Sequence, residues 1–474
     1  MTTFGALTGR LQKFYIPKYL IKDEQKIGEI PNTRTAYGTA VGIAWASVAE
    51  AFLISLISMA DTLMVSVVGD EAIAAIGLVT QPRFLVQTLV LSLNLSIVSI
   101  TARRKGEQNP TGASDCLKQG LVLSLIFSIL FLLIVTPYSE PILRFAGARD
   151  DAIGMSKAYF DIILMGLPIC NLSLTISAAL RGIGNTRASM AINMSSNVVN
   201  LILNYLLIGG NFGFPRLEVR GAAIATVIGW SVGLALACVF VTRRDGFLSI
   251  LSRRGWLPER NMLKSMFKVA SGSFIEQLCM RAGFLTYGIL IAGLGTIVYA
   301  THQILSNIMH LSFAFGEGFG IASSSLIGQN LGAKRPDLAI MYGKICHRLS
   351  VITSTFIFIV MSLFGRAMLH AFTENPQIIE TGSLILYIMI VIIYGQSAQI
   401  IYMGSLRGAG DTRYTAVVSL ICITFIRPLL SLLFAYTFGL GLVGAWLAFT
   451  IDQFTRLTLT YRRFSSGNWV TLKL

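Results

Sequence analysis

The stretch Ala44–Gln81, AWASVAEAFLISLISMADTLMVSVVGDEAIAAIGLVTQ, places two carboxylates inside an apolar run that is long enough to cross a bilayer. An ionisable group at that depth is costly, so it usually faces a protein interior or a wet cavity and marks an ion or substrate path. Glu50 and Asp61 are eleven residues apart, which returns them to nearly the same helix face, roughly 16 Å apart along the axis. The stretch therefore predicts a membrane helix with both acids on one face.

The same stretch recurs later in the chain at a constant displacement of 226 residues. Glu50 corresponds to Glu276, and the segment Arg181–Arg187, RGIGNTR, corresponds to Arg407–Arg413, RGAGDTR. Further matches at this displacement are Gly69 with Gly295, Ala74 with Ala300, Ser99 with Ser325 and Gly106 with Gly332. This is an internal duplication, and many secondary transporters are built from two such halves around a central site.

The composition indicates an integral membrane protein. Hydrophobic residues make up 54% of the 474 residues and charged residues 13%, and the mean hydropathy is +0.68, outside the range of soluble globular proteins. Apolar runs of about 20 residues predict twelve spans. They lie at 38–66, 73–101, 118–138, 152–179, 188–209, 220–242, 264–293, 297–328, 342–369, 378–404, 413–438 and 441–462. With the duplication, the predicted fold is all-α and polytopic, with twelve transmembrane helices in two homologous six-helix bundles.

The positive charge of the chain is distributed as a membrane topology requires. The formal net charge is +15, and with a cytoplasmic N-terminus most Lys and Arg fall on the inside, the positive-inside pattern. The excess then reflects topology and attraction to anionic membrane lipids rather than nucleic-acid binding. The sequence predicts a multi-pass protein of the cell membrane with both termini cytoplasmic. The predicted parts are a tail at 1–37, a bundle at 38–242, a cytoplasmic linker at 243–263, a second bundle at 264–462 and a tail at 463–474.

No catalytic or metal-binding pattern is visible. The six cysteines are scattered singly without CxxC spacing, so neither a disulfide framework nor a zinc site is predicted. The GxG within Arg181–Arg187 follows a membrane helix instead of a strand, which excludes a phosphate-binding loop. We interpret both copies of this motif as tight cytoplasmic turns anchored by arginines, Arg181 and Arg187 in the first half and Arg407 and Arg413 in the second. We expect no enzymatic activity and no cofactor.

The fifth span carries a stripe of amides. Asn193, Asn197, Asn200 and Asn204 recur at helical spacing on one face. Asparagines in membrane helices can serve only as interhelical hydrogen-bond partners, but four on one stripe favour a cavity lining. Thr226, near the start of the sixth span, adds a hydroxyl that could face the same cavity.

The second half supplies a further set of polar candidates for the cavity. Glu276 and Glu317 have similar predicted depths on consecutive spans, and Arg281 is a candidate counter-ion for one of these acids. The tenth span offers Tyr394, Gln396 and Gln399 but no carboxylate.

Several motifs together make the chain resemble the multidrug and toxic compound extrusion (MATE) family. They include Met59-Ala60-Asp61-Thr62, the two RGxGxTR turns, and Asn200-Leu-x-Leu-Asn204-Tyr205. The others are Gly221-Ala222-Ala223-x-Ala225-Thr226 and Gly328-Gln329-Asn330-Leu331-Gly332-Ala333. The resemblance covers nearly the whole chain after the N-terminal tail.

The resemblance implies alternating access and export of amphipathic, often cationic, organic compounds in exchange for H⁺ or Na⁺. It makes Asp61 the family's first-helix acid and Asn200 and Asn204 its fifth-helix site, where some members have an Asp at the second position. Asn204 removes that carboxylate, and the tenth-helix Asp of some members is also absent. We therefore expect Asp61, with Asn200, Asn204 and Thr226, to bind the coupling ion, and Glu276 to be its partner from the second half. The expected partners are small organic substrates and membrane lipids, with the chain acting as a monomer. The alternative is a flippase for lipid-linked oligosaccharide from the same superfamily.

Overall fold

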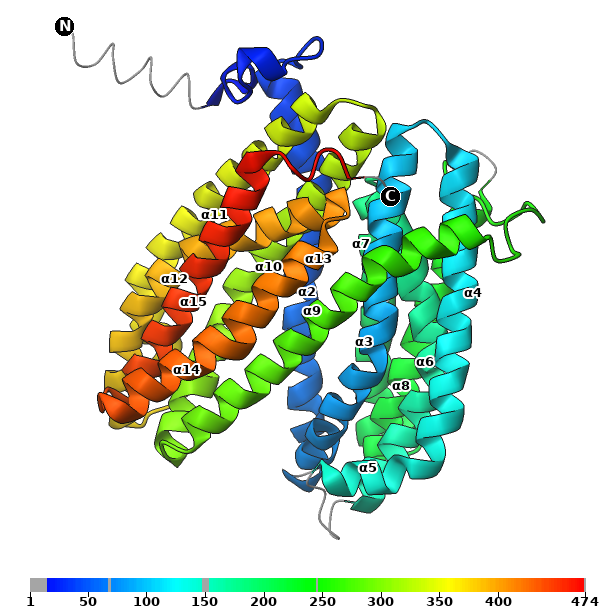
Figure 1. Cartoon of the computed structure of the whole chain (residues 1–474). Helices are drawn as coiled ribbons and strands as arrows, with labels where there is room; N and C mark the ends of the chain where they lie inside the picture. Colours follow the sequence, from blue (N-terminus) through cyan, green and yellow to red (C-terminus); the bar gives the residue numbers. More distant parts are fainter. Residues whose placement is uncertain (1–14, 67–69, 147–152, 244–245, 473–474) are drawn as a thin grey trace, which may run out of the picture. The chain divides into compact units, whose positions relative to one another are not determined.

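The computed structural model describes residues 15–66, 70–146, 153–243 and 246–472, and this part of the chain is helical with no strand (Figure 1). The first half contains α2 (Thr33–Ser66), α3 (Asp70–Gly106), α4 (Pro110–Val135), α5 (Ser139–Phe145), α6 (Ile153–Gly182), α7 (Thr186–Gly209) and α8 (Glu218–Thr242). The second half contains α9 (Arg260–Ala292), α10 (Thr296–Gly332), α11 (Pro336–His370), α12 (Pro376–Ala409), α13 (Thr412–Ser419), α14 (Arg427–Ser431) and α15 (Gly441–Ser466). Two π-helical segments, η5 (Leu420–Ile426) and η6 (Leu432–Thr437), continue α13 and α14.

Each of the twelve predicted spans coincides with one of these helices or with a run of consecutive ones. Within the described residues, nine helices are long and apolar enough to cross a membrane, and ten if α3 counts as one bent span. The bend in α3 is 50° and lies between Leu85 and Gln87, one turn after Pro82. The remaining two, α10 and α15, carry charged side chains such as Glu317 and Asp452 within the helix.

The helices form two compact units. The N-terminal unit contains residues 49–105 and 109–270, and the C-terminal unit contains the described residues up to 48 together with 106–108 and 271–472. Both α2 and α9 therefore begin in one unit and end in the other. These units group the chain by contacts, so the bundle boundaries drawn from the sequence at 38–242 and 264–462 stay a prediction.

Each unit has its own apolar interior. One cluster of the N-terminal unit surrounds Leu93 and Leu117, and another surrounds Phe160. In the C-terminal unit one apolar cluster contains the fully buried Trp446 together with Met389. Many large apolar side chains remain exposed, such as Leu363 of α11 with an exposed fraction of 71%. Such exposed apolar surface suits contact with lipid.

The two RGxGxTR motifs form the same turn. Gly184 and Gly410 have φ angles of 84° and 88°, in the left-handed region where glycine is favoured. The next residue in each turn, Asn185 or Asp411, donates its backbone N–H five residues back, at 2.9 and 2.8 Å. Side chains at the preceding glycines would collide with a neighbouring helix, because an added Cβ on Gly408 would lie 2.2 Å from the Ser324 backbone oxygen. The predicted tight turns are therefore present in both halves.

The segment ahead of α2 is tied to the beginning of α11 within the C-terminal unit. The Arg335 guanidinium donates to the Glu29 backbone oxygen at 2.9 Å, and the Lys344 ammonium donates to the Leu20 backbone oxygen at 2.7 Å. The backbone N–H of Ile27 donates to the Asp337 carboxylate at 3.3 Å. Leu20 and Ile21 are buried beside these contacts.

The predicted linker folds back on α4 in the N-terminal unit. The Lys118 ammonium donates to the Arg254 backbone oxygen at 2.6 Å, and the Ser249 backbone N–H donates to the Ser114 hydroxyl at 3.1 Å. The linker is thus held by side chains near the beginning of α4.

Candidate functional site

Asp61 of α2 lies within a cluster of neutral polar side chains from α7 and α8. The Asn204 amide donates to Asp61 Oδ1 at 2.9 Å, and Asn204 is itself buried. Asn200 lies one turn earlier on α7, and Thr226 approaches it from α8. The four residues predicted to bind the coupling ion therefore meet in the N-terminal unit.

The Asn200 amide completes this cluster when its oxygen and nitrogen are assigned from their neighbours. In the orientation that satisfies both atoms, Nδ2 donates to Asp61 Oδ2 at 3.2 Å, and the oxygen accepts from the Thr226 backbone N–H at 3.2 Å. Each oxygen of the Asp61 carboxylate then accepts from one amide. The Thr226 hydroxyl donates to the Ala222 backbone oxygen at 2.8 Å.

The chemistry of this cluster suits a small cation. In the described part of the chain the Asp61 carboxylate is held by amides rather than by a Lys or Arg. The amide oxygen of Asn204 is buried without a donor among the described residues. A carboxylate with neighbouring oxygen ligands is the donor set that hard cations prefer, and a carboxylate without a basic partner also accepts a proton more readily than a paired one.

Glu50, on the same helix, makes the corresponding contact with the other end of α7. The Asn193 amide donates to Glu50 Oε1 at 2.5 Å. Both pairs, Glu50 with Asn193 and Asp61 with Asn204, are separated by 143 residues, so α2 and α7 run parallel in a fixed register. Asn197 is different, because its amide donates to the Asn193 backbone oxygen of its own helix at 2.9 Å.

The asparagine stripe therefore works partly as interhelical hydrogen-bond partners, the alternative that the sequence left open. Two of its four members approach Asp61, and one holds Glu50.

Glu50 and Glu276, which are related by the duplication, each lie beside an arginine of a turn motif. In the C-terminal unit Glu276 is fully buried and accepts from the Arg407 guanidinium and from the Thr415 hydroxyl, the latter at 2.8 Å. In the N-terminal unit Arg181 Nη1 lies 3.9 Å from Glu50 and donates to the Ser189 hydroxyl at 3.1 Å. Each of the three residues in one unit has its counterpart 226 positions away in the other: the glutamate, the arginine, and the hydroxyl residue, which is Ser189 in the first half and Thr415 in the second.

These pairs identify the counter-ion of Glu276 as Arg407. Arg281 is half-buried on α9, and its part as a counter-ion for one of the second-half acids stays a prediction. Arg181 and Arg407 anchor more than the turn, since each of these two lies beside an acid on the first helix of its half. Arg187 and Arg413 are exposed at the beginnings of α7 and α13.

The other second-half candidates lie in the C-terminal unit. Glu317 is exposed on α10, and the Tyr394 hydroxyl donates to Thr355 at 3.0 Å. Gln396 and Gln399 are buried in α12. Their predicted place in a substrate cavity stays a prediction.

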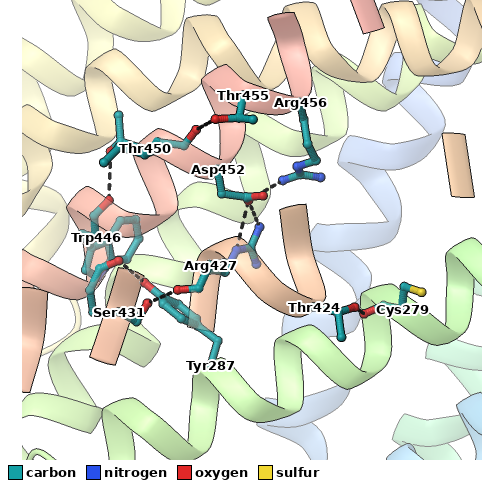
Figure 2. A network of polar contacts seen from close by, with 12 residues as sticks. Cys279, Tyr287, Thr424, Arg427, Ser431, Trp446, Thr450, Asp452, Thr455 and Arg456 are labelled. Atoms are coloured by element: carbon teal, nitrogen blue, oxygen red, sulfur yellow. Dashed lines mark hydrogen bonds and ion pairs between the residues drawn. The ribbon is translucent and has the colours of Figure 1, made fainter. Parts of the chain in front are cut away.

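The sequence reading missed a charged network inside the C-terminal unit (Figure 2). Asp452 of α15 accepts from Arg427 of α14 at 3.0 Å and from Arg456 of α15 at 3.0 Å. The signal was available, because Asp452 and Arg456 are four residues apart inside a predicted span, a spacing that places them together on a helix.

Comparisons with known proteins agree with this architecture. The MatE family model matches residues 46–206 and 273–433, once in each half. The probable multidrug resistance protein NorM of Thermotoga maritima is 29% identical over 464 residues, covering 97% of this chain and 96% of that protein. A FAD transporter of Shewanella oneidensis is 27% identical over 380 residues, covering 77% of this chain and 80% of that protein.

A solved structure confirms the fold. It is described as the outward-facing conformation of a multidrug resistance MATE family transporter of the MOP superfamily, with a TM-score of 0.84 at 22% identity, covering 91% of this chain and 96% of that one. The predicted all-α fold of twelve transmembrane helices in two bundles is thereby confirmed.

Proposed function

This chain belongs to the MatE family, whose members are membrane transporters and not enzymes, and we propose that it exports amphipathic, often cationic, organic compounds in exchange for H⁺ or Na⁺. The names of its relatives support the substrate class, since the Thermotoga maritima protein is described as a probable multidrug resistance protein. The FAD transporter among the relatives makes FAD a second compound to assay.

One observation carries the proposed ion coupling. The Asp61 carboxylate is half-buried in a membrane helix, held by two amides, and adjacent to an Asn204 oxygen that has no donor among the described residues. A buried carboxylate whose charge is not matched by a basic side chain is costly, and binding a proton or Na⁺ removes that cost. Asp61 is the residue that we assign to ion coupling, with Asn200, Asn204 and Thr226 as its neighbours.

Exchange follows if the substrate and the coupling ion bind different states with different affinity. A ligand shifts a conformational equilibrium only by its differential affinity for the two states, and two ligands coupled through one equilibrium affect each other reciprocally. A chain that changes state only when loaded with the ion or with the compound then exchanges one for the other.

The test is gradient-driven efflux by the Asp61→Asn variant. Asparagine keeps the shape of the side chain and removes its titratable charge, so we expect folded protein and loss of uphill export. The measurement is dye and FAD uptake into inverted membrane vesicles, under a proton gradient and under a Na⁺ gradient in separate experiments. The gradient that drives uptake identifies the ion.

Asp161→Asn is the matched control. Asp161 is also a membrane-helix carboxylate of the N-terminal unit, but it pairs with Lys157 at 2.5 Å on its own helix, as the spacing of four residues predicts. This variant should export at a rate close to that of the unmodified chain. Uphill export by Asp61→Asn with unaltered ion dependence would show that the coupling site lies elsewhere.

The proposed location is the cell membrane, with both termini in the cytoplasm and the monomer as the working unit. The positive-inside distribution of Lys and Arg supports this orientation.

A further inference from the structure

The C-terminal unit contains a carboxylate that two arginines hold at once. Asp452 is fully buried, and the exposed fractions of Arg427 and Arg456 are 1% and 6%. Arg427 donates to Asp452 Oδ2 through Nε at 3.0 Å and through Nη2 at 2.5 Å, and Arg456 donates to the same oxygen at 3.0 Å. Figure 2 shows the carboxylate between the two guanidinium groups.

The network carries one positive charge more than it carries negative charge. Three aromatic rings stabilise the excess positive charge by cation–π contacts with Arg427. Its guanidinium lies 4.4 Å from the ring centre of Phe449, 5.2 Å from that of Phe284 and 5.6 Å from that of Tyr287. The negative faces of such rings attract a guanidinium. A mobile cation is disfavoured here, because Asp452, the acid of this network among the described residues, already has two guanidinium partners.

Arg427 of this network lies at the second-half counterpart of the Asp61 cluster, because its guanidinium contacts Tyr287 and Phe449. Tyr287 is the 226-residue counterpart of Asp61. The segment Gly221–Thr226, GAAIAT, aligns with Gly444–Phe449, GAWLAF, at a displacement of 223 residues instead of 226, and this alignment makes Phe449 the counterpart of Thr226. Arg427 falls one residue beyond the counterpart of Asn200, and the preceding π-helical segment η5 accounts for the extra residue.

Every other buried carboxylate of the C-terminal unit also has an arginine. Glu276 pairs with Arg407, Asp337 pairs with Arg335, and Asp411 pairs with Arg463. These three and Asp452 are the buried acids of this unit among the described residues. In the N-terminal unit Asp61, by contrast, has two amides.

We propose that Arg427 and Arg456 are built-in cations that permanently fill the second-half counterpart of the Asp61 site, so that the chain takes up one coupling ion per cycle. This inference rests on the proposed function of Asp61. In this role the arginines do not transport an ion themselves. They prevent ion binding in the second half, so that only the first half binds the coupling ion.

The decisive measurement is the number of cations bound by the purified chain in lipid nanodiscs. Na⁺ is counted with ²²Na⁺ at equilibrium, and protons are counted with an indicator dye when saturating substrate is added. The unmodified chain should give one cation in whichever arm responds, and Asp61→Asn should give none. Two cations for the unmodified chain would overturn the inference.

A pair of variants tests the arginines directly. Arg427→Gln combined with Arg456→Gln leaves Asp452 without a cation and should raise the count by one. Adding Asp452→Asn removes the new acid and should return the count to that of the unmodified chain. An unchanged count in the folded double variant would overturn the inference, and so would an extra cation that persists when Asp452 is replaced. If the double variant does not fold, the count for the unmodified chain decides.

The two proposals fail in distinguishable ways. If Asp61→Asn leaves the count unchanged, the proposed coupling site is wrong. The change of one cation between the double and triple variants still tests the arginines, because it is measured relative to the same background and does not involve Asp61.

Discussion

Asn204 determines how much negative charge the Asp61 cluster holds. It donates to the carboxylate from a buried position at 2.9 Å, where a second acid would place two like charges side by side. Two carboxylates that share a site do not ionise independently, because the proton affinity of one rises. The amide therefore keeps the cluster at a single negative charge.

We expect Asn204→Asp to change the ion dependence of export without abolishing it. The added carboxylate should let the site retain a proton or Na⁺ at lower concentration, which shifts the half-saturating concentration by about tenfold for each 1.4 kcal/mol of added attraction. Efflux rates measured against pH and Na⁺ concentration give this shift.

Asn197→Asp is the control for that shift. Asn197 is on the same helix, but its amide donates to its own backbone rather than to Asp61. An equal shift in both variants would mean that the added charge acts at long range and not at the Asp61 cluster.

Glu276 and Arg407 form a pair that we expect to stabilise the C-terminal unit. Removing one partner of a buried ion pair costs roughly 3 kcal/mol or more. Glu276→Gln should therefore lower both the melting temperature and the export rate, more than Glu317→Gln does, since Glu317 is exposed. The measurements are thermal unfolding of the purified variants and vesicle uptake at matched expression.

Replacing both partners separates the effect on stability from the effect on export. Glu276→Gln combined with Arg407→Met removes both charges of the pair and should recover most of the lost stability. Export that stays low in this stable double variant would assign Glu276 a part in transport, whereas recovered export would make the pair structural.

At the level of elements, the duplicated turns are possible because small residues let helices approach closely. An added Cβ on Gly408 of α12 would lie 2.2 Å from the Ser324 backbone oxygen of α10, and backbone cannot move aside as a flexible side chain can. An added Cβ on the equivalent glycine of the first half, Gly182, would lie 2.0 Å from the Thr101 hydroxyl and 2.7 Å from the Val98 backbone oxygen, both of α3. Small residues at such crossings are typical of membrane helices.

Gly408→Ala should lower the free energy of unfolding by about 1 to 3 kcal/mol, the usual cost of overpacking. The yield of folded protein and its melting temperature should fall as a result. Gly38→Ala in α2 is the matched control, because nothing lies within 4 Å of its added Cβ and alanine favours the helix. Fluorescence-detected size-exclusion chromatography after heating gives both values. A Gly408→Ala variant as stable as Gly38→Ala would show that the crossing tolerates the extra methyl group.

Apolar runs predicted the helices well, because the bilayer itself imposes their length and composition. All twelve predicted spans coincide with helices, and the i,i+4 pair of Lys157 and Asp161 is present as expected. The Asp61 cluster could also be predicted, since Asn200, Asn204 and Thr226 are spaced by helical geometry and by family motif.

What could not be predicted depends on pairings between distant helices. Glu276 and Arg407 are 131 residues apart, and no local spacing connects an acid in one helix with a turn residue after another. The counterpart of Asn200 was also hidden, because the π-helical residue before Arg427 breaks the constant displacement of 226. Sequence patterns show the periodicity along one helix, but they do not show which helices pack against each other.

At the level of the whole molecule, the distribution of Lys and Arg predicts that both termini lie in the cytoplasm. We expect Arg253→Cys and Lys334→Cys to be protected from an impermeant maleimide in intact cells and to react in inverted vesicles. The six native cysteines are free, and five of them are buried, so the unmodified chain provides a low background. Labelling of either position in intact cells would reverse the proposed topology.

The tie between the N-terminal segment and α11 has a consequence for the order in which the protein is made. Glu29 and Leu20 find their partners 306 and 324 residues later in the chain. At ribosomal rates of 5 to 20 residues per second, that gap lasts roughly 15 to 60 seconds. During that time Leu20 and Ile21 stay exposed, because α11, which packs against them in the folded chain, has not been made. A nascent chain arrested before residue 335 should therefore be cleaved by protease between residues 15 and 32, and a completed chain should resist at the same sites.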